Sequence, residues 1–319
     1  MKIFDFSECE YSNRNGSYGG AAGDKDGILI NGEPWIAKYP KSNEGMSRND
    51  KLSRTTQTPL SEYIGSHIYG LLGYPVHETL LGIRKGFVVV ACKDFCDDKT
   101  RLLEMRTLKN IHISEMNQKF QLDLHETSDD HLVDLNELFL HFELNPEISK
   151  IKGVAERFWD QVVIDGLIGN NDRNNGNWGI LACGEKRELA PIFDNGASFY
   201  PKKSTLAIQQ LLKLPESDQA RNNSNIQEPF TLDGEHHLNY KSMLELDAKK
   251  IPVVQVEELR KSICKNAALV EQNLSSIVDF IKSIPNEYNG YEIITEPRRE
   301  YYLKSFITRF EEVLKEKVN

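Results

Sequence analysis

The segment IGNNDRNNGNWG, residues 168–179, concentrates polar residues directly after an apolar run. It holds five Asn, three Gly and one Asp, and four residues separate Asp172 from Asn177. Carboxylate and amide oxygens are ligands for hard cations, and a carboxylate can also accept the proton of a substrate hydroxyl. The simpler interpretation is a turn that ends a helix, since Asn, Asp and Gly also favour turns.

The residues after this segment favour chemistry over a simple turn. The strand-like stretches WGILAC and LAPIF are joined by the turn GEKRE, and DNGAS comes next. A hairpin there would return the chain so that Asp194 lies beside Asp172 and Asn177. Phosphoryl transfer needs such a trio, because the phosphates and Mg²⁺ carry most of the charge and the protein supplies a base and oxygen ligands. We predict that Asp172 is the base, that Asn177 and Asp194 hold the metal, and that Gly196 turns the chain away sharply.

Arg173 adjoins the predicted base. A guanidinium here could position a phosphate or simply pair with a carboxylate, and the sequence leaves both open. We include it with Asp172 and Lys38 among the catalytic candidates.

The first hundred residues could bind a nucleotide. Residues 15–25, NGSYGGAAGDK, are Gly-rich, and backbone N–H groups in such a loop can cradle phosphates, although a flexible N-terminal loop would look the same. Lys38 lies in the apolar strand-like stretch WIAKYP, where a solvent-facing lysine is less expected. Glu62, on a helix predicted from Pro59 to Leu72, could pair with it, and Glu78 is the alternative. The run VVVACKDF would supply backbone groups for adenine. The predicted nucleotide-binding residues are Gly16, Ser17, Tyr18, Gly19, Gly20, Ala21, Lys25, Lys38, Glu62, Val90, Cys92, Asn177 and Asp194.

Two groups of elements must position these residues. The first third reads as short strands and one helix, with Asn31-Gly32 as a hairpin turn. The remainder is helical, most clearly in GVAERFWDQVVIDGLIG, whose apolar residues recur at helical spacing. We predict an α+β fold of two lobes, a β-rich N-lobe over residues 1–96 and a helical C-lobe over 97–319. The polar run Lys202–Asn239 is expected to lack regular structure.

Composition limits the partners. The 319 residues carry a net charge of −9, which disfavours binding to nucleic acid through overall charge. Apolar runs fall short of the ~20 residues of a membrane span, and the N-terminus lacks a classical secretion signal, so we expect synthesis in the cytoplasm without integral membrane association. Five scattered cysteines suit a reducing compartment. Cys92 and Cys96 could share a zinc ion, although no second Cys or His pair lies nearby.

The blocks SYGGAAGDK, IAKYPK, LIGNNDRNNGNWG and LAPIFDNGAS together resemble the HipA-like kinase family, a bacterial branch of the protein-kinase-like fold. The resemblance implies an ATP- and Mg²⁺-dependent Ser/Thr protein kinase in which Lys38 binds ATP, Asp172 is the catalytic base, and Asn177 and Asp194 hold Mg²⁺. It also implies autophosphorylation, with Ser17 at the position of the family's loop serine. A role in virulence, with release and entry into host cells, is a further implication.

Two departures from the family pattern stand out. Asn174 occupies the position after Asp-Arg where the family usually has His. The chain begins almost at the Gly-rich loop, without the N-terminal subdomain through which a DNA-binding antitoxin docks in part on the toxin members. An antitoxin partner is therefore not expected.

Two other functions remain open. The stretch FDNGASFYP also resembles the metal-binding segment of phosphoinositide kinases, although the net charge of −9 disfavours a lipid surface. A membrane-facing loop would then draw on the basic and apolar residues Lys202, Lys203, Leu211, Leu212 and Lys213. The chain could instead be a catalytically silent binding module with a kinase fold. The intact set of Lys38, Asp172, Asn177 and Asp194 argues against this function.

Overall fold

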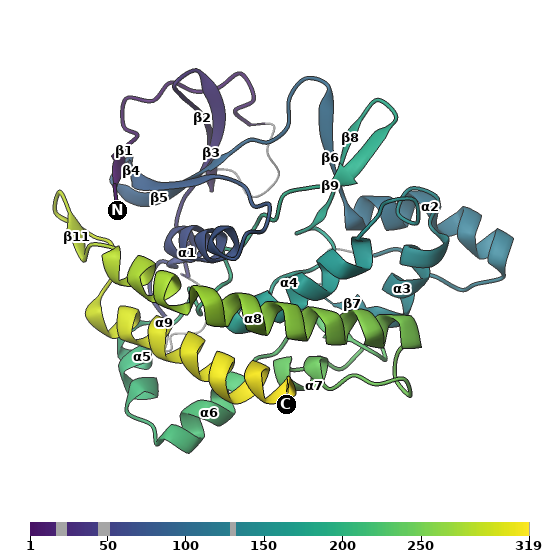
Figure 1. Ribbon diagram of the computed structural model, residues 1–319. Helices are drawn as coiled ribbons and strands as arrows, with labels where there is room; N and C mark the ends of the chain where they lie inside the picture. Colours follow the sequence, from purple (N-terminus) through teal and green to yellow (C-terminus); the bar gives the residue numbers. More distant parts are fainter. Residues whose placement is uncertain (17–23, 44–51, 128–131, 319) are drawn as a thin grey trace.

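The computed structural model describes residues 1–16, 24–43, 52–127 and 132–318, which form a β-rich lobe above a helical lobe (Figure 1). Within these residues, five strands of the upper lobe form one sheet in the order β1-β4-β5-β3-β2. Its neighbouring strands are antiparallel, except that β1 and β4 run parallel. The strands are β1 (Phe4–Asp5), β2 (Lys25–Ile30), β3 (Glu33–Lys38), β4 (Thr79–Arg84) and β5 (Phe87–Lys93).

The β2–β3 hairpin turns at Asn31 and Gly32, as predicted. Both residues have left-handed φ angles, 52° and 79°, which the tight turn of a two-residue hairpin requires. The hairpin register places Lys38, the last residue of β3, opposite Lys25 of β2. The pairing of β3 with β5 then places Lys38 opposite Val90, so the turn fixes the lysine relative to β2 and the second pairing fixes it in the sheet.

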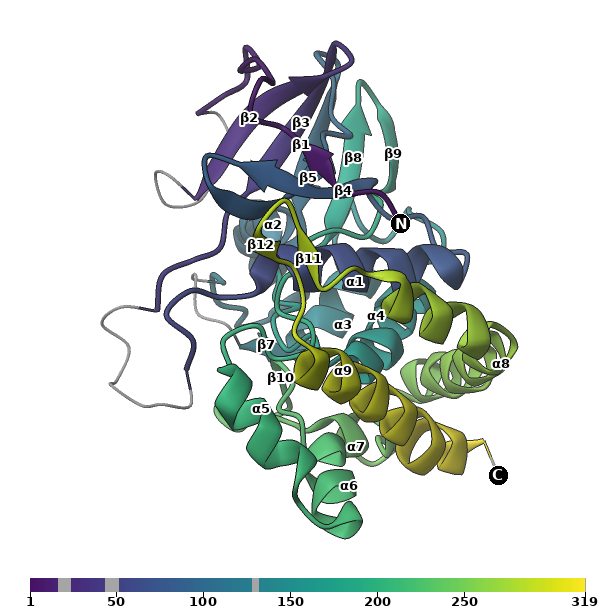
Figure 2. The same ribbon diagram turned by 90° about the vertical axis from the view of Figure 1, so that its left-hand side faces the viewer.

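Helix α1 (Thr58–Leu71) lies under the sheet and joins the two lobes (Figure 2). Leu60, Ile64 and Ile68 belong to one buried cluster that also contains Leu81 of β4 and Trp159 of the lower lobe. Because α1 contributes to the cores of both lobes, its position is fixed on two sides.

The lower lobe surrounds helix α4, which packs against α7, α8 and α9. Figure 1 shows α8 and α9 side by side across its face, and none of the helices described is long and apolar enough to span a lipid bilayer. Its helices are α2 (Met105–Phe120), α3 (Leu135–Leu144), α4 (Val154–Ile168), α5 (Thr205–Leu212), α6 (Glu216–Ser224), α7 (Tyr240–Leu244), α8 (Val253–Ser283) and α9 (Glu296–Arg309), which continues into a π-helical turn (Phe310–Leu314) and a 3₁₀ turn (Lys315–Lys317).

Short strands complete the lower lobe. Strands β6, β8 and β9 form a sheet beside the cleft between the lobes, and β8–β9 is the hairpin predicted before Asp194. The strands are β6 (Thr100–Glu104), β7 (Val133–Asp134), β8 (Gly179–Cys183), β9 (Lys186–Leu189), β10 (Phe230–Thr231), β11 (Glu287–Tyr288) and β12 (Tyr291–Glu292).

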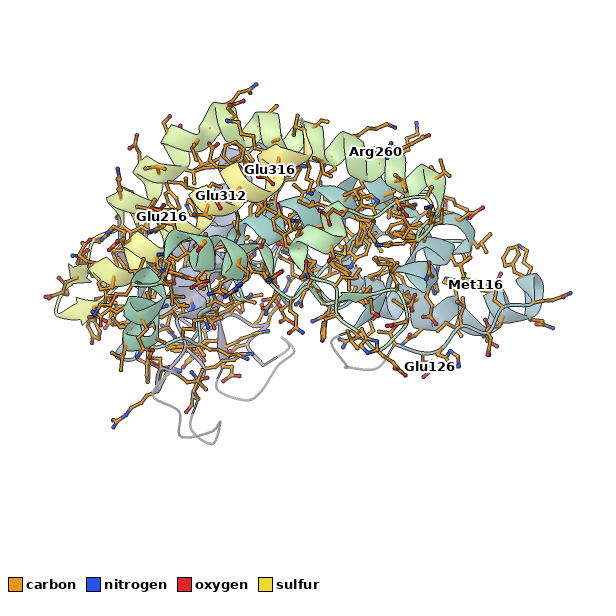
Figure 3. The ribbon with its side chains drawn as sticks, turned by 90° about the horizontal axis from the view of Figure 1, so that it is seen from below. Met116, Glu126, Glu216, Arg260, Glu312 and Glu316 are labelled. Atoms are coloured by element: carbon orange, nitrogen blue, oxygen red, sulfur yellow. The ribbon has the colours of Figure 1, made fainter. Side chains whose placement is uncertain are left out.

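The prediction that Lys202–Asn239 lacks regular structure is wrong, because α5 and α6 lie within it. The Ser204 side chain accepts a hydrogen bond from the Ala207 N–H and so caps α5. Ala207 and Ile208 are buried in a helix that packs against α9. Seen from below, exposed carboxylates such as Glu216 of α6 mark the outer face of this region (Figure 3).

Candidate active site

Lys38 joins two carboxylates from distant parts of the chain. Its Nζ lies 2.8 Å from Glu62 Oε2 and 2.9 Å from Asp194 Oδ1. Burial opposes ionisation of Lys38 and Glu62, but the opposite charges outweigh it, raising the pKa of Lys38 and lowering that of Glu62. Lys38 likewise lowers the pKa of Asp194. The alternative partner Glu78 instead lies 3.8 Å from Lys93.

The loop after α4 is held in place by Arg173, which is buried. Its guanidinium contacts the Asp165 carboxylate through Nε at 2.7 Å and Nη2 at 3.1 Å. Nη1 donates to the carbonyls of Asn177 and Phe193, and Nη2 donates to Asn195 Oδ1. One side chain therefore ties the Asn177 loop to the segment that carries Asp194. The sequence left two roles open for Arg173, and in the structure it pairs with a carboxylate, that of Asp165.

Asp172 lies on the same loop and is partly exposed. Asn174, at the position of the family's His, donates from Nδ2 to Asp172 Oδ1 at 3.0 Å. Asn177 Nδ2 donates to the backbone carbonyl of Asp172 at 2.5 Å. The two amides therefore orient the predicted base and its backbone.

A cleft of about 960 Å³ lies between the lobes, and Lys38 and Asn174 line it, whereas Asp172 and Arg173 are not among its described lining residues. Asn177 and Asp194 line it, and positive side chains outnumber carboxylates among its described lining residues, which suits a polyanionic ligand. Its cationic lining residues are Arg14, Lys25, Lys38, Lys93, Arg101 and Arg106, and its acidic ones are Asp94, Glu104 and Asp194. Arg101 and Arg106 were not among the sequence predictions, because β6 and the start of α2 reach the cleft only through pairing with β8.

The chain is 34% identical over 246 residues to the serine/threonine-protein kinase CtkA of Helicobacter pylori strain J99, covering 76% of this chain and 70% of that protein. The chain belongs to the CtkA family of serine/threonine-protein kinases. The crystal structure of a Helicobacter pylori proinflammatory kinase CtkA matches with a TM-score of 0.81 and 27% identity, over 99% of this chain and 97% of that one.

A more distant match supports the same fold. HipA from Shewanella oneidensis MR-1, in a toxin–antitoxin complex with HipB and operator DNA, matches with a TM-score of 0.51 and 14% identity, over 94% of this chain and 66% of that one. The predicted two-lobed, HipA-like kinase fold is thus confirmed. No family model matches the chain.

The predicted nucleotide-binding residues of this CtkA-family kinase differ in where they lie. Lys25, Lys38 and Cys92 line the cleft. Val90 is instead fully buried in the core, and the lining continues past β5 through residues 93–96. Gly16 has a left-handed φ of 87°. The predicted residues Ser17, Tyr18, Gly19, Gly20 and Ala21 lie outside the described residues.

The turn after Asp194 differs from the prediction. Asp194 itself has the left-handed conformation, with φ 57°, and Gly196 is not among the residues with positive φ. A Cβ on Gly196 would lie 2.7 Å from Thr58 Cγ2 and 3.3 Å from Glu62 Oε2. The chain does turn here, with the Ser198 N–H donating to the Asn195 carbonyl at 3.1 Å, but it does so without a positive φ at Gly196. Glycine therefore serves the close approach of this segment to α1.

Asn195 is a buried polar residue that was not among the sequence predictions. Its backbone N–H donates to Glu62 Oε1 at 2.9 Å, and its Nδ2 donates to Ser66 Oγ at 2.9 Å. With Arg173 bonded to its Oδ1, Asn195 links the residue after Asp194 to α1 and to the loop of the predicted base. Its place inside the DNGAS motif was a signal, but an Asn there reads equally well as a turn residue.

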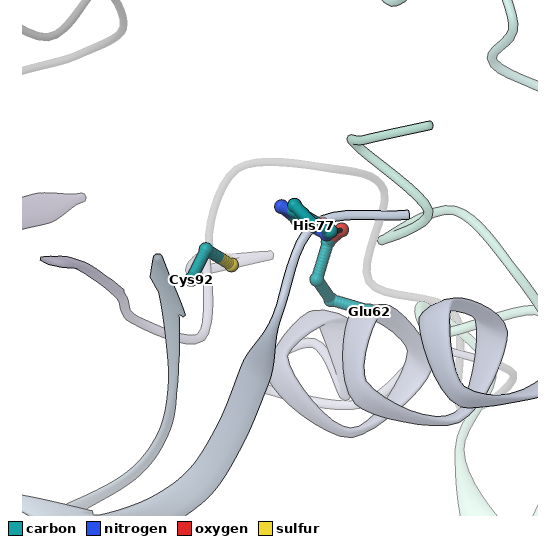
Figure 4. A group of neighbouring side chains, drawn as sticks. All are labelled: Glu62, His77 and Cys92. Atoms are coloured by element: carbon teal, nitrogen blue, oxygen red, sulfur yellow. Dashed lines mark ion pairs between the residues drawn. The ribbon is translucent and has the colours of Figure 1, made fainter. Parts of the chain in front are cut away.

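Glu62, His77 and Cys92 lie close together at the back of the cleft (Figure 4). One ligand atom of each falls within 4.8 Å of the others, a spacing that could hold a cation. The Lys38 ammonium already places a positive charge beside Glu62, and burial raises the pKa of the Cys92 thiol. Both effects oppose a metal at this cluster.

Proposed function

We propose that this kinase transfers the γ-phosphoryl group of ATP, with Mg²⁺, to Ser or Thr hydroxyls of proteins, its own chain included. The observation that carries the proposal is the bridging position of Lys38, bonded to Glu62 and to Asp194 in a cleft that Asn177 also lines. A lysine, a paired glutamate and two oxygen-bearing side chains are the parts that phosphoryl transfer requires.

In this proposal each residue has one role. Lys38, oriented by Glu62, contacts the phosphates. The carboxylate of Asp194 and the amide oxygen of Asn177 suit a hard cation, and bound Mg²⁺ would neutralise charge on the transferred group. Asp172, oriented by Asn174, accepts the proton of the substrate hydroxyl.

We also propose residue 96 as the boundary between an N-lobe, residues 1–96, and a C-lobe, residues 97–319. Arg14 contacts the connecting segment, with Nη1 2.9 Å from Asp94 Oδ2 and 2.6 Å from the carbonyl of Cys96. Because this segment lines the cleft after β5, its backbone is our candidate for contact with adenine.

The test is transfer of radiolabelled γ-phosphate, comparing the wild type with Asp172→Asn in the presence and absence of Mg²⁺. A generic protein acceptor and phosphatidylinositol vesicles are offered in parallel, and the kinase chain is inspected for its own label. We expect Mg²⁺-dependent label in protein and in the wild-type chain alone, with the site of self-labelling mapped to test Ser17. Label in lipid alone, or none with ATP bound, would refute the proposal and favour a lipid kinase or a silent module.

The Helicobacter pylori relative CtkA is a proinflammatory kinase, and we propose in addition that the present kinase leaves its cell and enters host cells. This proposal rests on the family relationship alone. It is tested by measuring the kinase in the culture medium of intact cells against a cytoplasmic marker enzyme. Equal release of both proteins would contradict it.

A further inference from the structure

The buried carboxylate of Glu62 uses both of its oxygens. Oε2 faces Lys38 at 2.8 Å, whereas Oε1 accepts from the Asn195 N–H at 2.9 Å and lies 3.0 Å from His77 Nε2. A carboxylate paired with Lys38 is ionised and can only accept hydrogen bonds. The contact is attractive when His77 Nε2 carries a proton, which Glu62 Oε1 and Ser66 Oγ, both 3.0 Å away, then share.

His77 is itself held in place by the segment that leads to Asp194. Its backbone N–H donates to the carbonyl of Ile192 at 3.0 Å, and the Ile192 N–H donates to Pro75 at 2.8 Å. Ser66 Oγ lies 3.0 Å from the same Nε2, so the imidazole is fixed from α1 as well. His77 is buried and lines the back of the cleft.

We propose that His77 is a positioning residue that holds Glu62 in the orientation in which Oε2 meets Lys38. This inference rests on the proposed function, since it assigns a support to the lysine that contacts the phosphates. Removing the donor would leave Oε1 with the backbone of Asn195 as its remaining described partner and would free the carboxylate to rotate. Lys38 would then be drawn toward Asp194, away from the position that serves ATP.

The experiment measures equilibrium binding of ATP as well as turnover, in His77→Leu and His77→Gln. A hydrogen bond to a charged group contributes about 1.5–3 kcal/mol, so we expect His77→Leu to lose about 10- to 100-fold in kcat/KM, with weaker ATP binding. His77→Gln, whose amide can also donate, should recover most of the loss. Equal losses for the two variants would overturn the proposal.

A double-mutant cycle tests whether His77 acts through Glu62. In a Glu62→Gln background, His77→Leu should cause little further loss of ATP affinity, because the carboxylate that it orients is gone. Additive losses would contradict the proposal. Because binding is the readout, the cycle remains decisive even if no phosphoryl transfer is detected in any variant, a result that would instead count against the proposed function.

His67 provides a matched control on α1. It is also largely buried, but its Nδ1 contacts the Tyr63 carbonyl and its ring stacks on Phe280, 4.9 Å away. We expect His67→Leu to alter thermal stability without a matching change in ATP affinity. If His77→Leu fails to fold, His77→Asn, which shortens the reach of the donor, replaces it in the cycle, and full ATP affinity in that variant would overturn the proposal.

Discussion

Asp165 and Asp172 lie seven residues apart on one continuous segment, yet their surroundings are opposite. Asp165 is fully buried and accepts hydrogen bonds from Arg173, from the Tyr69 hydroxyl at 2.9 Å and from Asn170 Nδ2 at 3.0 Å. Asp172 is partly exposed beside the cleft, with an Asn side chain as a partner. Residue type therefore does not distinguish the two carboxylates, whereas burial and hydrogen bonding do.

This difference in burial indicates different roles for Asp165, behind the loop, and Asp172, beside the cleft. A carboxylate whose oxygens are filled by buried donors can neither accept a substrate proton nor bind a metal, so Asp165 can only hold the loop. We call Asp165, Arg173, Asn195, Ser66 and Tyr69 the rear network. It connects α4, α1 and the segment after Asp194, and it lies behind the residues that line the cleft.

The largest effect on activity is expected from Asp172→Asn. Loss of the proton acceptor should reduce kcat by about 10³-fold, because general-base catalysis contributes about 10²–10⁴-fold. Stability should be nearly unchanged, since Asp172 lies outside the rear network. Single-turnover transfer and thermal unfolding, measured on the same sample, check both statements. A clear loss of stability with activity retained would reverse the assignment of the two carboxylates.

Asp165→Asn should show the opposite pattern. Breaking one partner of a buried ion pair costs about 3–5 kcal/mol of folding free energy, because Arg173 would keep a buried charge without its carboxylate. We expect a markedly lower unfolding midpoint in urea, and a loss of activity that follows the fraction unfolded. An unchanged midpoint would mean that the rear network does not support the loop.

The positions of Lys38, Asn177 and Asp194, which line the cleft, could largely be predicted because they follow from local sequence. The β2–β3 turn at Asn31-Gly32 sets the position of Lys38, and the β8–β9 hairpin returns the chain so that Asp194 approaches Asn177. Such connections are short, and their turn chemistry is visible in the residues themselves. The pairing of Lys38 with Glu62 was predicted from their order along the chain, with the lysine on a strand and the glutamate on the helix that follows it.

The rear network could not be predicted, because its partners come from distant parts of the chain. Arg173 meets Asp165 on the preceding helix and Asn195 after the hairpin, and the sequence does not rank these partners against a phosphate. Asn195 and His77 have no periodicity that sets them apart from turn or core residues. The burial of α5 against α9 is likewise visible only after the fold has formed.

Gly196→Ala tests the contact between α1 and the segment that follows Asp194. The added methyl group would meet Thr58 Cγ2 at 2.7 Å and approach Glu62 Oε2, so α1 or the Asp194 segment must shift. We expect kcat/KM to fall by about 10-fold, or about 1.4 kcal/mol. Gly70→Ala, on α1, is the control, because its added Cβ would make only an ordinary contact of 3.6 Å with Val76 Cγ1 and its φ is not positive. An active Gly196→Ala would show that α1 yields to this segment.

The effect with the smallest slope, spread over two pH units, concerns a buried group that, unlike Asp165, has no partner of opposite charge. His141 is fully buried, and in the described residues its Nε2 has no hydrogen-bond partner. Burial and the neighbouring Lys109 lower the pKa of His141 to about 3. An unfolded histidine has a pKa of about 6.5, so between these values the unfolded chain binds a proton that the folded chain does not.

Stability should therefore fall as the pH drops below about 6.5, by up to about 1.4 kcal/mol per pH unit. Urea unfolding of the wild type and His141→Gln between pH 7 and pH 5 measures this slope, which should be smaller in the variant; burial also lowers the pKa of His67, so part of the slope should remain. Asp165→Asn, which keeps His141, serves as the reference and should retain the slope at a lower overall stability. A slope that is unchanged in His141→Gln would assign the acid sensitivity to other groups. A smaller slope would show that an uncharged buried histidine lowers the stability of the fold at low pH.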